Sequence, residues 1–143
     1  MDEDLYQEQI LDHYRYPRHK GKIARANVVY REVNPLCGDE LTFYAAVENG
    51  TIKSLSFEGQ GCAISQASAS LLAEFLQGKT VAEALALGEN TIYSLLGITI
   101  SHTRTKCALL SLHTIQKGIR QKGFKEVGLS KKSMTTPAKT RKG

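Results

Sequence analysis

Three cysteines and one aspartate are the residues of this 143-residue chain whose types and spacing could do metal or sulfur chemistry. They are Cys37, Asp39, Cys62 and Cys107. An odd number of widely spaced cysteines does not indicate a disulfide framework. A free cysteine is most often a small buried hydrophobic residue, but the surroundings of these three argue against that interpretation.

Each cysteine lies where the local sequence exposes its thiol or favours its thiolate. Cys37 lies in turn-forming sequence between two predicted strands. Cys62 follows a glycine-rich turn and begins a predicted helix, whose free N–H groups and positive dipole end favour a thiolate. Cys107 begins another predicted helix, shortly after the cations Arg104 and Lys106. All three positions are therefore suited to reactive or metal-binding thiols.

A predicted β-hairpin would bring part of this set together. Strand-like segments at residues 41–47 and 52–57 flank Asn49-Gly50, a dipeptide that suits a two-residue type I′ turn. Glu48 then faces Thr51, and the same register, extended past the point where the ladder frays, places Cys37 opposite Cys62. We therefore expect both cysteines and Asp39 at one end of the sheet.

The remaining pattern predicts one strand and several helices. The strand covers residues 28–33, after a helix over residues 3–15. Later helices are expected at residues 63–76, from a Thr80–Glu83 capping box to near Gly88, at residues 90–96 and at residues 106–122. Strands followed by helices predict an α+β fold rather than a parallel βαβ sheet.

The basic charge of the chain belongs to its C-terminal end. The chain has 19 basic and 14 acidic residues, and the excess of five lies within residues 124–143. We expect a domain over residues 1–123 and a basic, disordered tail over residues 124–143. Nucleic-acid binding by the tail is an unlikely role, because no aromatic residues are interleaved with its cations. No apolar run could span a membrane and no signal sequence precedes the domain, so we expect a cytoplasmic protein.

Three thiolates and one carboxylate form a four-ligand set that suits tetrahedral zinc or iron in a cluster. Soft sulfur ligands exclude magnesium and calcium as the natural occupants. The spacing contains no Cys-x-x-Cys pair, so the metal motif is weak by itself. The glycines before Cys62 lack the remaining residues of a phosphate loop. The four histidines are weaker candidates, and only His102 lies near a cysteine.

Three motifs resemble the iron–sulfur cluster assembly scaffold family, the group of IscU, SufU and NifU N-terminal domains. They are Asn-Pro-Leu-Cys-Gly-Asp at residues 34–39, Gly-Gln-Gly-Cys-Ala-Ile-Ser at 59–65 and Lys-Cys-Ala at 106–108. The resemblance covers residues 3–122 and implies a three-stranded antiparallel sheet with helices packed on it. It also implies that Cys37, Asp39, Cys62 and Cys107 hold a [2Fe–2S] cluster or zinc at one end of that sheet.

Two departures place the chain between the IscU and SufU types. IscU-type members have His before the third cysteine, where this chain has Lys106. Their Hsp70-docking peptide Leu-Pro-Pro-Val-Lys is replaced here by residues 100–104, so a dedicated Hsp70 is a doubtful partner. Arg-Thr-Lys-Cys at residues 104–107 is similar to the corresponding motif of SufU-type members. This chain lacks the insertion that those members usually have before that motif.

The first of three functional hypotheses is a scaffold rather than an enzyme. The resemblance implies that it accepts sulfur from a cysteine desulfurase and iron from an iron donor, holds a [2Fe–2S] cluster and passes it to apo-proteins. Thiolates suit this role, because they both ligate iron and attack persulfides. The second hypothesis is a zinc-dependent, SufU-like sulfur-transfer partner, in which Cys37 or Cys107 would leave the zinc and take up sulfur. The third is a structural zinc domain with a nucleic-acid-binding tail.

Overall fold

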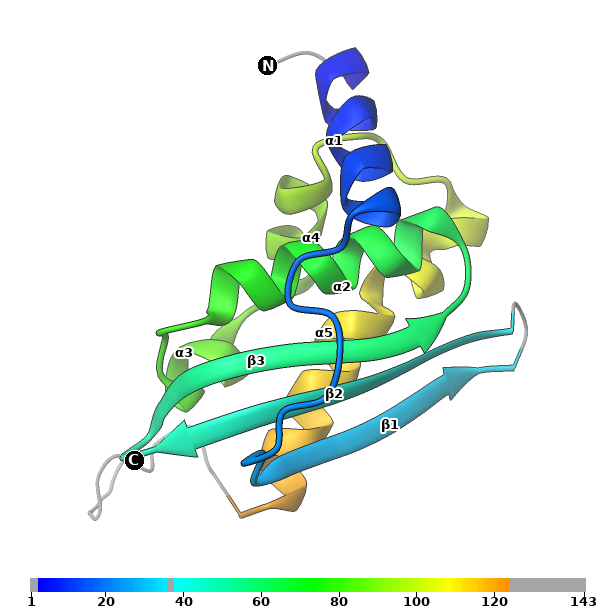
Figure 1. The fold of residues 1–143 in the computed structure, drawn as a ribbon. Coiled ribbons are helices and arrows are strands. Elements are labelled where there is room, and N and C mark those ends of the chain that lie inside the picture. The colour runs from blue at the N-terminus through cyan, green and yellow to red at the C-terminus, as the bar shows by residue number, and fades with distance from the viewer. Residues whose placement is uncertain (1–2, 36–37, 124–143) are drawn as a thin grey trace.

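The computed structural model describes residues 3–35 and 38–123, so Cys37 and the predicted tail at residues 124–143 lie outside the described residues. The fold is α+β, as predicted (Figure 1). Three antiparallel strands lie in the order β1 (Val28–Asn34), β2 (Asp39–Glu48) and β3 (Thr51–Gln60). The helices are α1 (Glu3–Arg15), α2 (Ala63–Leu76), α3 (Val81–Ala86), α4 (Glu89–Leu96), the 3₁₀ helix η1 (His102–Arg104) and α5 (Thr105–Gln121).

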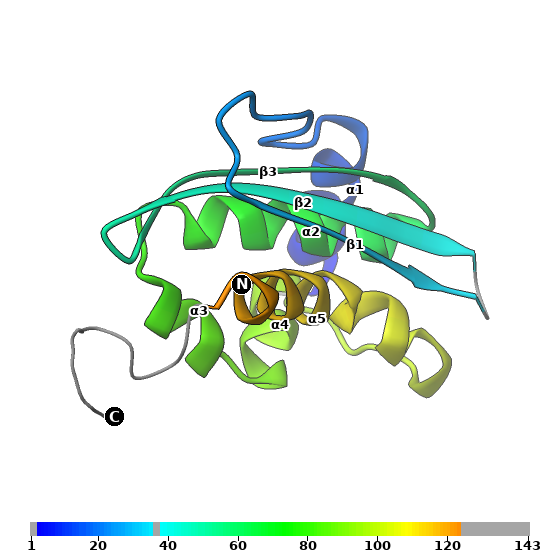
Figure 2. The same ribbon diagram turned by 90° about the horizontal axis from the view of Figure 1, so that it is seen from below.

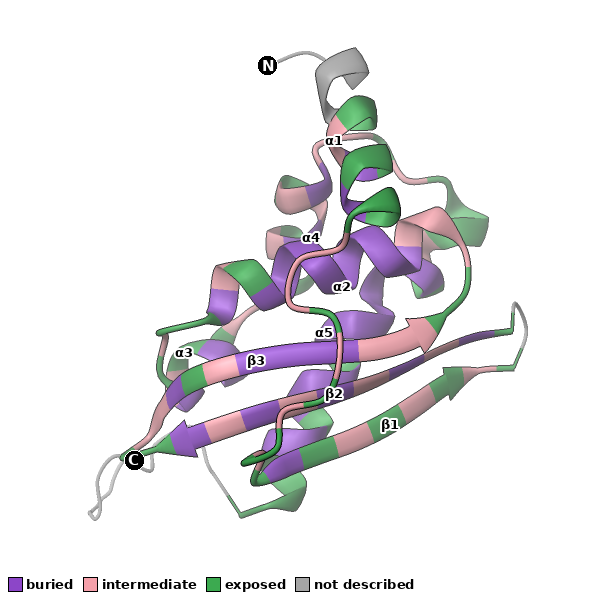
Figure 3. Cartoon of the chain, in the orientation of Figure 1, coloured by how far each residue is buried: buried purple, intermediate pink, exposed green. Residues whose placement is uncertain are grey.

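The helices cover one face of the sheet. Helix α2 packs on β3, while α5 packs on β1 and β2 and also contacts α2 (Figure 2). The core between these layers is apolar, and its largest fully buried side chains include Phe43, Phe57, Leu72 and Ile115 (Figure 3). Alternate residues of β2 are buried, as expected for a sheet with one face on the core. No helix among the described residues is long and apolar enough to cross a membrane.

The hairpin between β2 and β3 confirms the predicted turn but not the whole predicted register. Asn49 and Gly50 have φ values of 54° and 74°, as a type I′ turn requires. Glu48 pairs with Thr51 as predicted, but the register shifts by one residue between Ala46 and Val47. An extra residue in β3 causes this shift, and the ladder ends at Glu40 and Gln60, before Cys62, as the sequence predicted. Beyond the shift, each residue of β2 pairs one position further along β3 than the predicted register has it.

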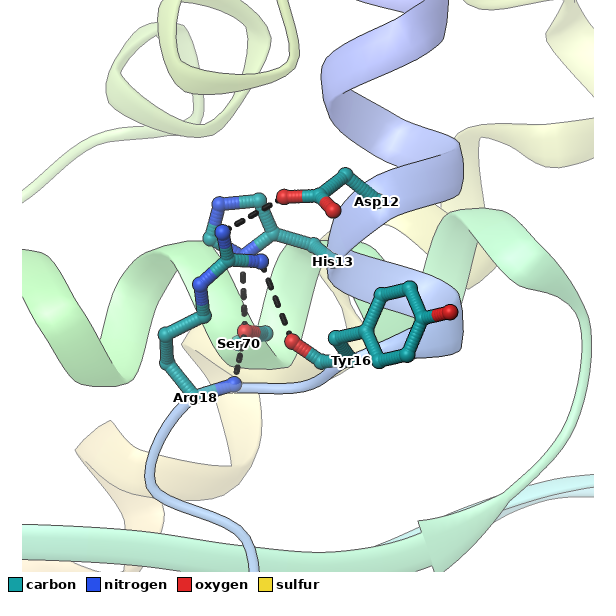
Figure 4. Close-up of polar contacts among 5 residues, drawn as sticks. All are labelled: Asp12, His13, Tyr16, Arg18 and Ser70. Carbon is teal, nitrogen blue, oxygen red and sulfur yellow. Dashed lines mark hydrogen bonds and ion pairs between the residues drawn. The ribbon is translucent and has the colours of Figure 1, made fainter.

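Helix α1 packs on α2 through a buried polar contact as well as through apolar packing. His13 is buried, and its Nδ1 lies 2.7 Å from the Ser70 hydroxyl of α2 (Figure 4). The Arg18 backbone N–H also donates to that hydroxyl. Leu11 and Tyr14 of helix α1 are exposed.

Residues 16–27, which we call the strap, cross the sheet on the face opposite α2 and α5 (Figure 2). The Gly21 N–H donates to the Phe57 carbonyl of β3, and the Phe57 N–H donates to the His19 carbonyl. At the far end, the Asn27 side chain donates to and accepts from the Val47 backbone. The strap thus covers part of the β3 edge and then leads into β1.

The ends of the helices follow the predicted chemistry. Cys62 is the N-cap of α2, and Gly78 follows that helix with a φ of 89°. Thr80 and Glu83 form the predicted capping box of α3. Helix α5 forms where it was predicted and buries Ala108, Leu112, Ile115 and Ile119.

Candidate metal centre

Asp39, Cys62 and Cys107 come together at one end of the sheet. Asp39 begins β2, Cys62 caps α2, and Cys107 lies in the first turn of α5. One carboxylate oxygen and the two sulfur atoms all lie within 4.8 Å of one another. The starts of three separate elements therefore meet at one point. The sequence predicted this for Asp39 and Cys62, and the family resemblance implied it for Cys107.

The Asp39 carboxylate is tied to the start of α2. Its Oδ1 accepts a 2.9 Å hydrogen bond from the Cys62 N–H, and its Oδ2 lies 3.9 Å from Cys62 Sγ. Asp39 is 1% exposed. A buried carboxylate needs hydrogen bonds to offset its lost hydration, and the positive end of the α2 dipole also favours its charge. Asp39 thus holds Cys62 in place while keeping a second oxygen beside the Cys62 thiol.

Gly61 allows this close approach. Its φ is 152°, in the region that favours glycine, and a Cβ at this position would collide with Oδ1 and Cγ of Asp39. The same Cβ would also come within 2.9 Å of the Ser65 hydroxyl. Ser65 in turn donates to the Cys62 carbonyl. A glycine before Cys62 is therefore required by the packing of Asp39 and not only by the turn.

Arg104 supplies positive charge beside the thiols. The negative charge of a Cys62 thiolate, with a hydrogen bond to it, raises the pKa of the Arg104 guanidinium above its ordinary value, and Cys107 adds to the effect. Arg104 ends the 3₁₀ helix η1 that leads into α5, so the backbone fixes its position next to Cys107. The described part of the site thus combines the Asp39 carboxylate, the Cys62 and Cys107 thiols and the Arg104 guanidinium.

Two buried serines fix α2 against α5 beneath the site. The Ser68 hydroxyl donates to the Ala108 carbonyl at 2.8 Å and lies 2.7 Å from the Ser111 hydroxyl. Both serines are almost fully buried. Because Ala108 follows Cys107 directly, this contact sets the distance between the thiol of α5 and the thiol of α2.

The donor set fits a thiophilic metal. Tetrahedral zinc with sulfur at about 2.3 Å and oxygen at about 2.1 Å needs ligand atoms roughly 3.6 Å apart. The 3.9 Å separation of Cys62 Sγ and Asp39 Oδ2 is close to this value. A fourth ligand is needed for a closed site, and Cys37 is two residues before Asp39 in the sequence. The described residues could hold zinc or iron, and their sulfur atoms disfavour magnesium and calcium.

The comparison with protein families decides which family this arrangement represents. The model for the "NifU-like N terminal domain" matches residues 5–127. This chain belongs to that family. As a NifU_N protein it is a member of the iron–sulfur cluster assembly scaffold group, which has both IscU and SufU members.

Individual relatives of this NifU_N protein include both types. The iron–sulfur cluster assembly scaffold protein IscU of Thermotoga maritima is 35% identical, with 82% of this chain and 94% of that protein covered. The zinc-dependent sulfurtransferase SufU of Bacillus subtilis is 32% identical, with coverage of 80% and 89%. A crystal structure of a scaffold protein assigned to the SUF system of Fervidobacterium islandicum is 30% identical, with a TM-score of 0.67 and coverage of 83% and 99%.

Other residues near the site were not found by sequence reasoning. The role of Gly61 in admitting the Asp39 carboxylate is visible only once β2 and α2 are packed together. Ser68 and Ser111 read as ordinary helix residues, because neither stands in a spacing typical of ligands. The histidines were weak candidates for metal ligands in the sequence. In the structure His102 and His113 are exposed, and His13 is buried against α2.

Proposed function

We propose that the chain accepts sulfur from a cysteine desulfurase, holds a [2Fe–2S] cluster and passes it to apo-proteins. The observation that carries this proposal is the convergence of Asp39, Cys62 and Cys107 within 4.8 Å. We propose Cys37 as the remaining ligand and residues 1–123 as the scaffold domain, followed by a basic tail at residues 124–143. The names of the IscU relatives support the same role.

The combination of thiolate and carboxylate ligands supports a cluster that can be transferred to another protein. Thiolates bind iron strongly, whereas the carboxylate of Asp39 is a harder and weaker ligand for the same metal. A site with four thiolates would retain its iron more firmly. Because Asp39 Oδ1 already accepts the Cys62 N–H, only part of its charge is available to the metal. This arrangement suits temporary storage of a cluster.

Sulfur acceptance needs a thiolate, and the proposal assigns it to Cys37 or Cys107. The thiolate attacks the terminal sulfur of a persulfide on the desulfurase. A new S–S bond forms as the S–S bond of the donor breaks, and the donor cysteine leaves as a thiolate. This transfer is redox-neutral, and conversion of the transferred sulfur to sulfide takes two electrons from an external donor.

The second candidate is a zinc-dependent sulfur-transfer partner. Zinc with three thiolates and one carboxylate would carry a net charge of about −2, which the nearby guanidinium of Arg104 would partly offset. The similarity to the B. subtilis zinc-dependent sulfurtransferase supports the same alternative. In that case the protein would take part in catalysis as a sulfurtransferase and would build no cluster.

Transfer assays on variants in which one cysteine is replaced at a time distinguish the two candidate functions. The full chain and its Cys37→Ser, Cys62→Ser and Cys107→Ser variants are incubated with a desulfurase and cysteine, with and without ferrous iron. The scaffold proposal predicts a cluster that activates an added apo-ferredoxin and is lost in every variant. Persulfide on one cysteine with zinc retained, and no cluster under any condition, would replace it with the sulfur-transfer role.

A further inference from the structure

Within residues 3–35 and 38–123, the outer edge of β1 is an open strand edge. Among the described residues, β2 is the only strand that pairs with β1, and the strap covers part of the opposite edge at β3 (Figure 1). An open edge presents unpaired backbone groups that can pair with another chain, and soluble proteins usually protect such edges. The β1 segment, Val-Val-Tyr-Arg-Glu-Val-Asn, contains no proline or lysine that would block pairing.

The two sides of this edge differ in chemistry. Val29 and Val33 are 52% and 45% exposed, and they lie on the face of the sheet away from the helices. Arg31 lies between them, but its guanidinium is held by Glu40 of β2 at 2.6 Å. The outer face of the edge is therefore formed by the two valines and by an ion pair without net charge.

The helix-facing side of the edge is basic. Helix α5 lies beneath β1, since Gly118 lies against Val28 and Tyr30. The α5 sequence contains no acidic residue, and its exposed positions include Lys106, His113, Lys117 and Arg120. Lys117 lies next to β1, because its Nζ lies 2.6 Å from a carboxylate oxygen of Glu32. Glu32, the acidic residue of β1, is thus already ion-paired.

We propose that the β1 edge binds an extended segment of a partner protein in which apolar and acidic residues alternate. Added as a further strand, such a segment places every second side chain on the outer face beside Val29 and Val33. The intervening acidic side chains then point toward the cations of α5. Backbone pairing supplies affinity, and the two kinds of side chain supply specificity.

A second copy of this chain suits the edge less well. Antiparallel pairing of two β1 strands centred on Arg31 would match Val29 with Val33 on the outer face, where the Arg31–Glu40 ion pair adds no net charge. It would also bring two acid-free α5 helices side by side. Charge therefore favours an acidic partner over a dimer.

The inference does not depend on the metal centre, so it is tested by binding alone. The probe is a fluorescein-labelled eight-residue peptide that alternates valine with aspartate or glutamate, titrated into the full chain and followed by anisotropy. A matched peptide with lysine in place of the acids tests charge. A peptide of the same sequence, N-methylated on alternate residues, tests backbone pairing at constant charge. Two N-methylated versions, one for each set of alternate residues, distinguish the two edges of the added strand.

The proposal predicts binding of the acidic peptide and loss of binding on N-methylation of one alternate set only. The double variant Val29→Asn with Val33→Asn should weaken binding roughly five- to tenfold. Lys117→Gln, which removes a cation of α5 and leaves Glu32 of β1 unpaired, should also weaken it. Lys53→Gln, which removes an exposed cation of β3, should leave binding unchanged. Circular dichroism and thermal unfolding show whether each variant is folded.

Amide hydrogen exchange locates the bound peptide. The proposal predicts slower exchange of amides within β1 when the peptide is present. Equal binding of both N-methylated peptides and the parent, or equal loss in Lys53→Gln, would reduce the effect to non-specific charge and overturn the proposal. A concentration-dependent dimer in sedimentation that the Val29 and Val33 changes abolish would assign the edge to a second copy instead.

Discussion

The Cys62 N–H donates to Oδ1 of Asp39 at 2.9 Å while the Cys62 thiol lies 3.9 Å from Oδ2 of the same carboxylate. One side chain therefore both caps helix α2 and faces the sulfur that the helix presents. This relation joins the fold to the chemistry, since the strand cannot shift without moving the thiol. It also explains why Gly61, between the two, has no room for a side chain.

Replacing Gly61 with alanine should disturb the site as well as the fold. The new Cβ collides with the Asp39 carboxylate, so we expect a loss of about 1–3 kcal/mol in the free energy of unfolding. We also expect zinc affinity, measured by competition with a chelator, to fall at least tenfold. Gly78→Ala is the matched control, because Gly78 also has positive φ but meets no atom within 4 Å. Unchanged zinc affinity in Gly61→Ala would contradict the described packing.

Replacing Asp39 with alanine should make a bound cluster more persistent. The change removes the weak ligand, and slower ligand exchange should lengthen the half-time of cluster transfer to an apo-ferredoxin. The Cys62 N–H loses its acceptor, so the unfolding free energy of the metal-free protein should also fall by about 1 kcal/mol. Asp12→Ala, an exposed acid on α1, serves as control. Faster cluster loss in Asp39→Ala would count against the proposed role of the carboxylate.

The contact between Ser68 and Ser111 should be measurable as a coupling energy. Ser68→Ala leaves the Ser111 hydroxyl and the Ala108 carbonyl without this buried partner, so we expect a cost of about 1–3 kcal/mol in unfolding free energy. The double change to alanine should cost less than the sum of the single changes. Strict additivity in urea denaturation would show that the two hydroxyls do not interact.

The docking of α1 should depend on pH through His13. Burial, and then the charge of Arg18, lower the pKa of His13 below its ordinary value of 6.5. Ser70 accepts from the Arg18 N–H, which leaves its hydroxyl hydrogen to donate to a neutral His13. The folded protein therefore binds fewer protons than the unfolded chain at mildly acidic pH.

The sign of this effect is fixed by the lowered pKa. The His13 contribution to stability is complete above pH 6.5 and is lost as the pH falls from the ordinary pKa through the folded one. Unfolding midpoints should therefore fall more steeply with acidification in the wild type than in His13→Gln. His113→Gln, an exposed histidine of α5, should retain the wild-type slope. Parallel curves for the wild type and His13→Gln would refute this assignment.

Much of the fold could be predicted because its signals are local. The Asn49-Gly50 turn, the Thr80–Glu83 capping box and the apolar face of α5 each depend on residues near one another in the sequence. The register beyond Val47 could not be predicted, because no glycine or proline marks the extra residue in β3. The buried contact of His13 with the Ser70 hydroxyl of α2 could not be predicted, because no pattern within α1 reveals it.

The candidate site was predictable in part for the same reason. Cys62 and Cys107 stand at helix starts, and Asp39 stands at a strand start, so their elements could be placed from sequence. That the starts of the three elements meet at one point depends on long-range packing, including the buried contact of Ser68 with α5. The resemblance to a known family supplied that link. Cys37 remains a prediction, because it lies outside the described residues.

The most direct test of the central claim is anaerobic reconstitution of the full chain with ferrous iron, cysteine and a cysteine desulfurase. Visible absorbance and metal analysis are then measured on the desalted protein. A cluster scaffold predicts charge-transfer bands with iron and sulfide bound in equal amounts. Zinc retained without such bands would contradict the scaffold account and would identify the protein as a sulfur-transfer partner.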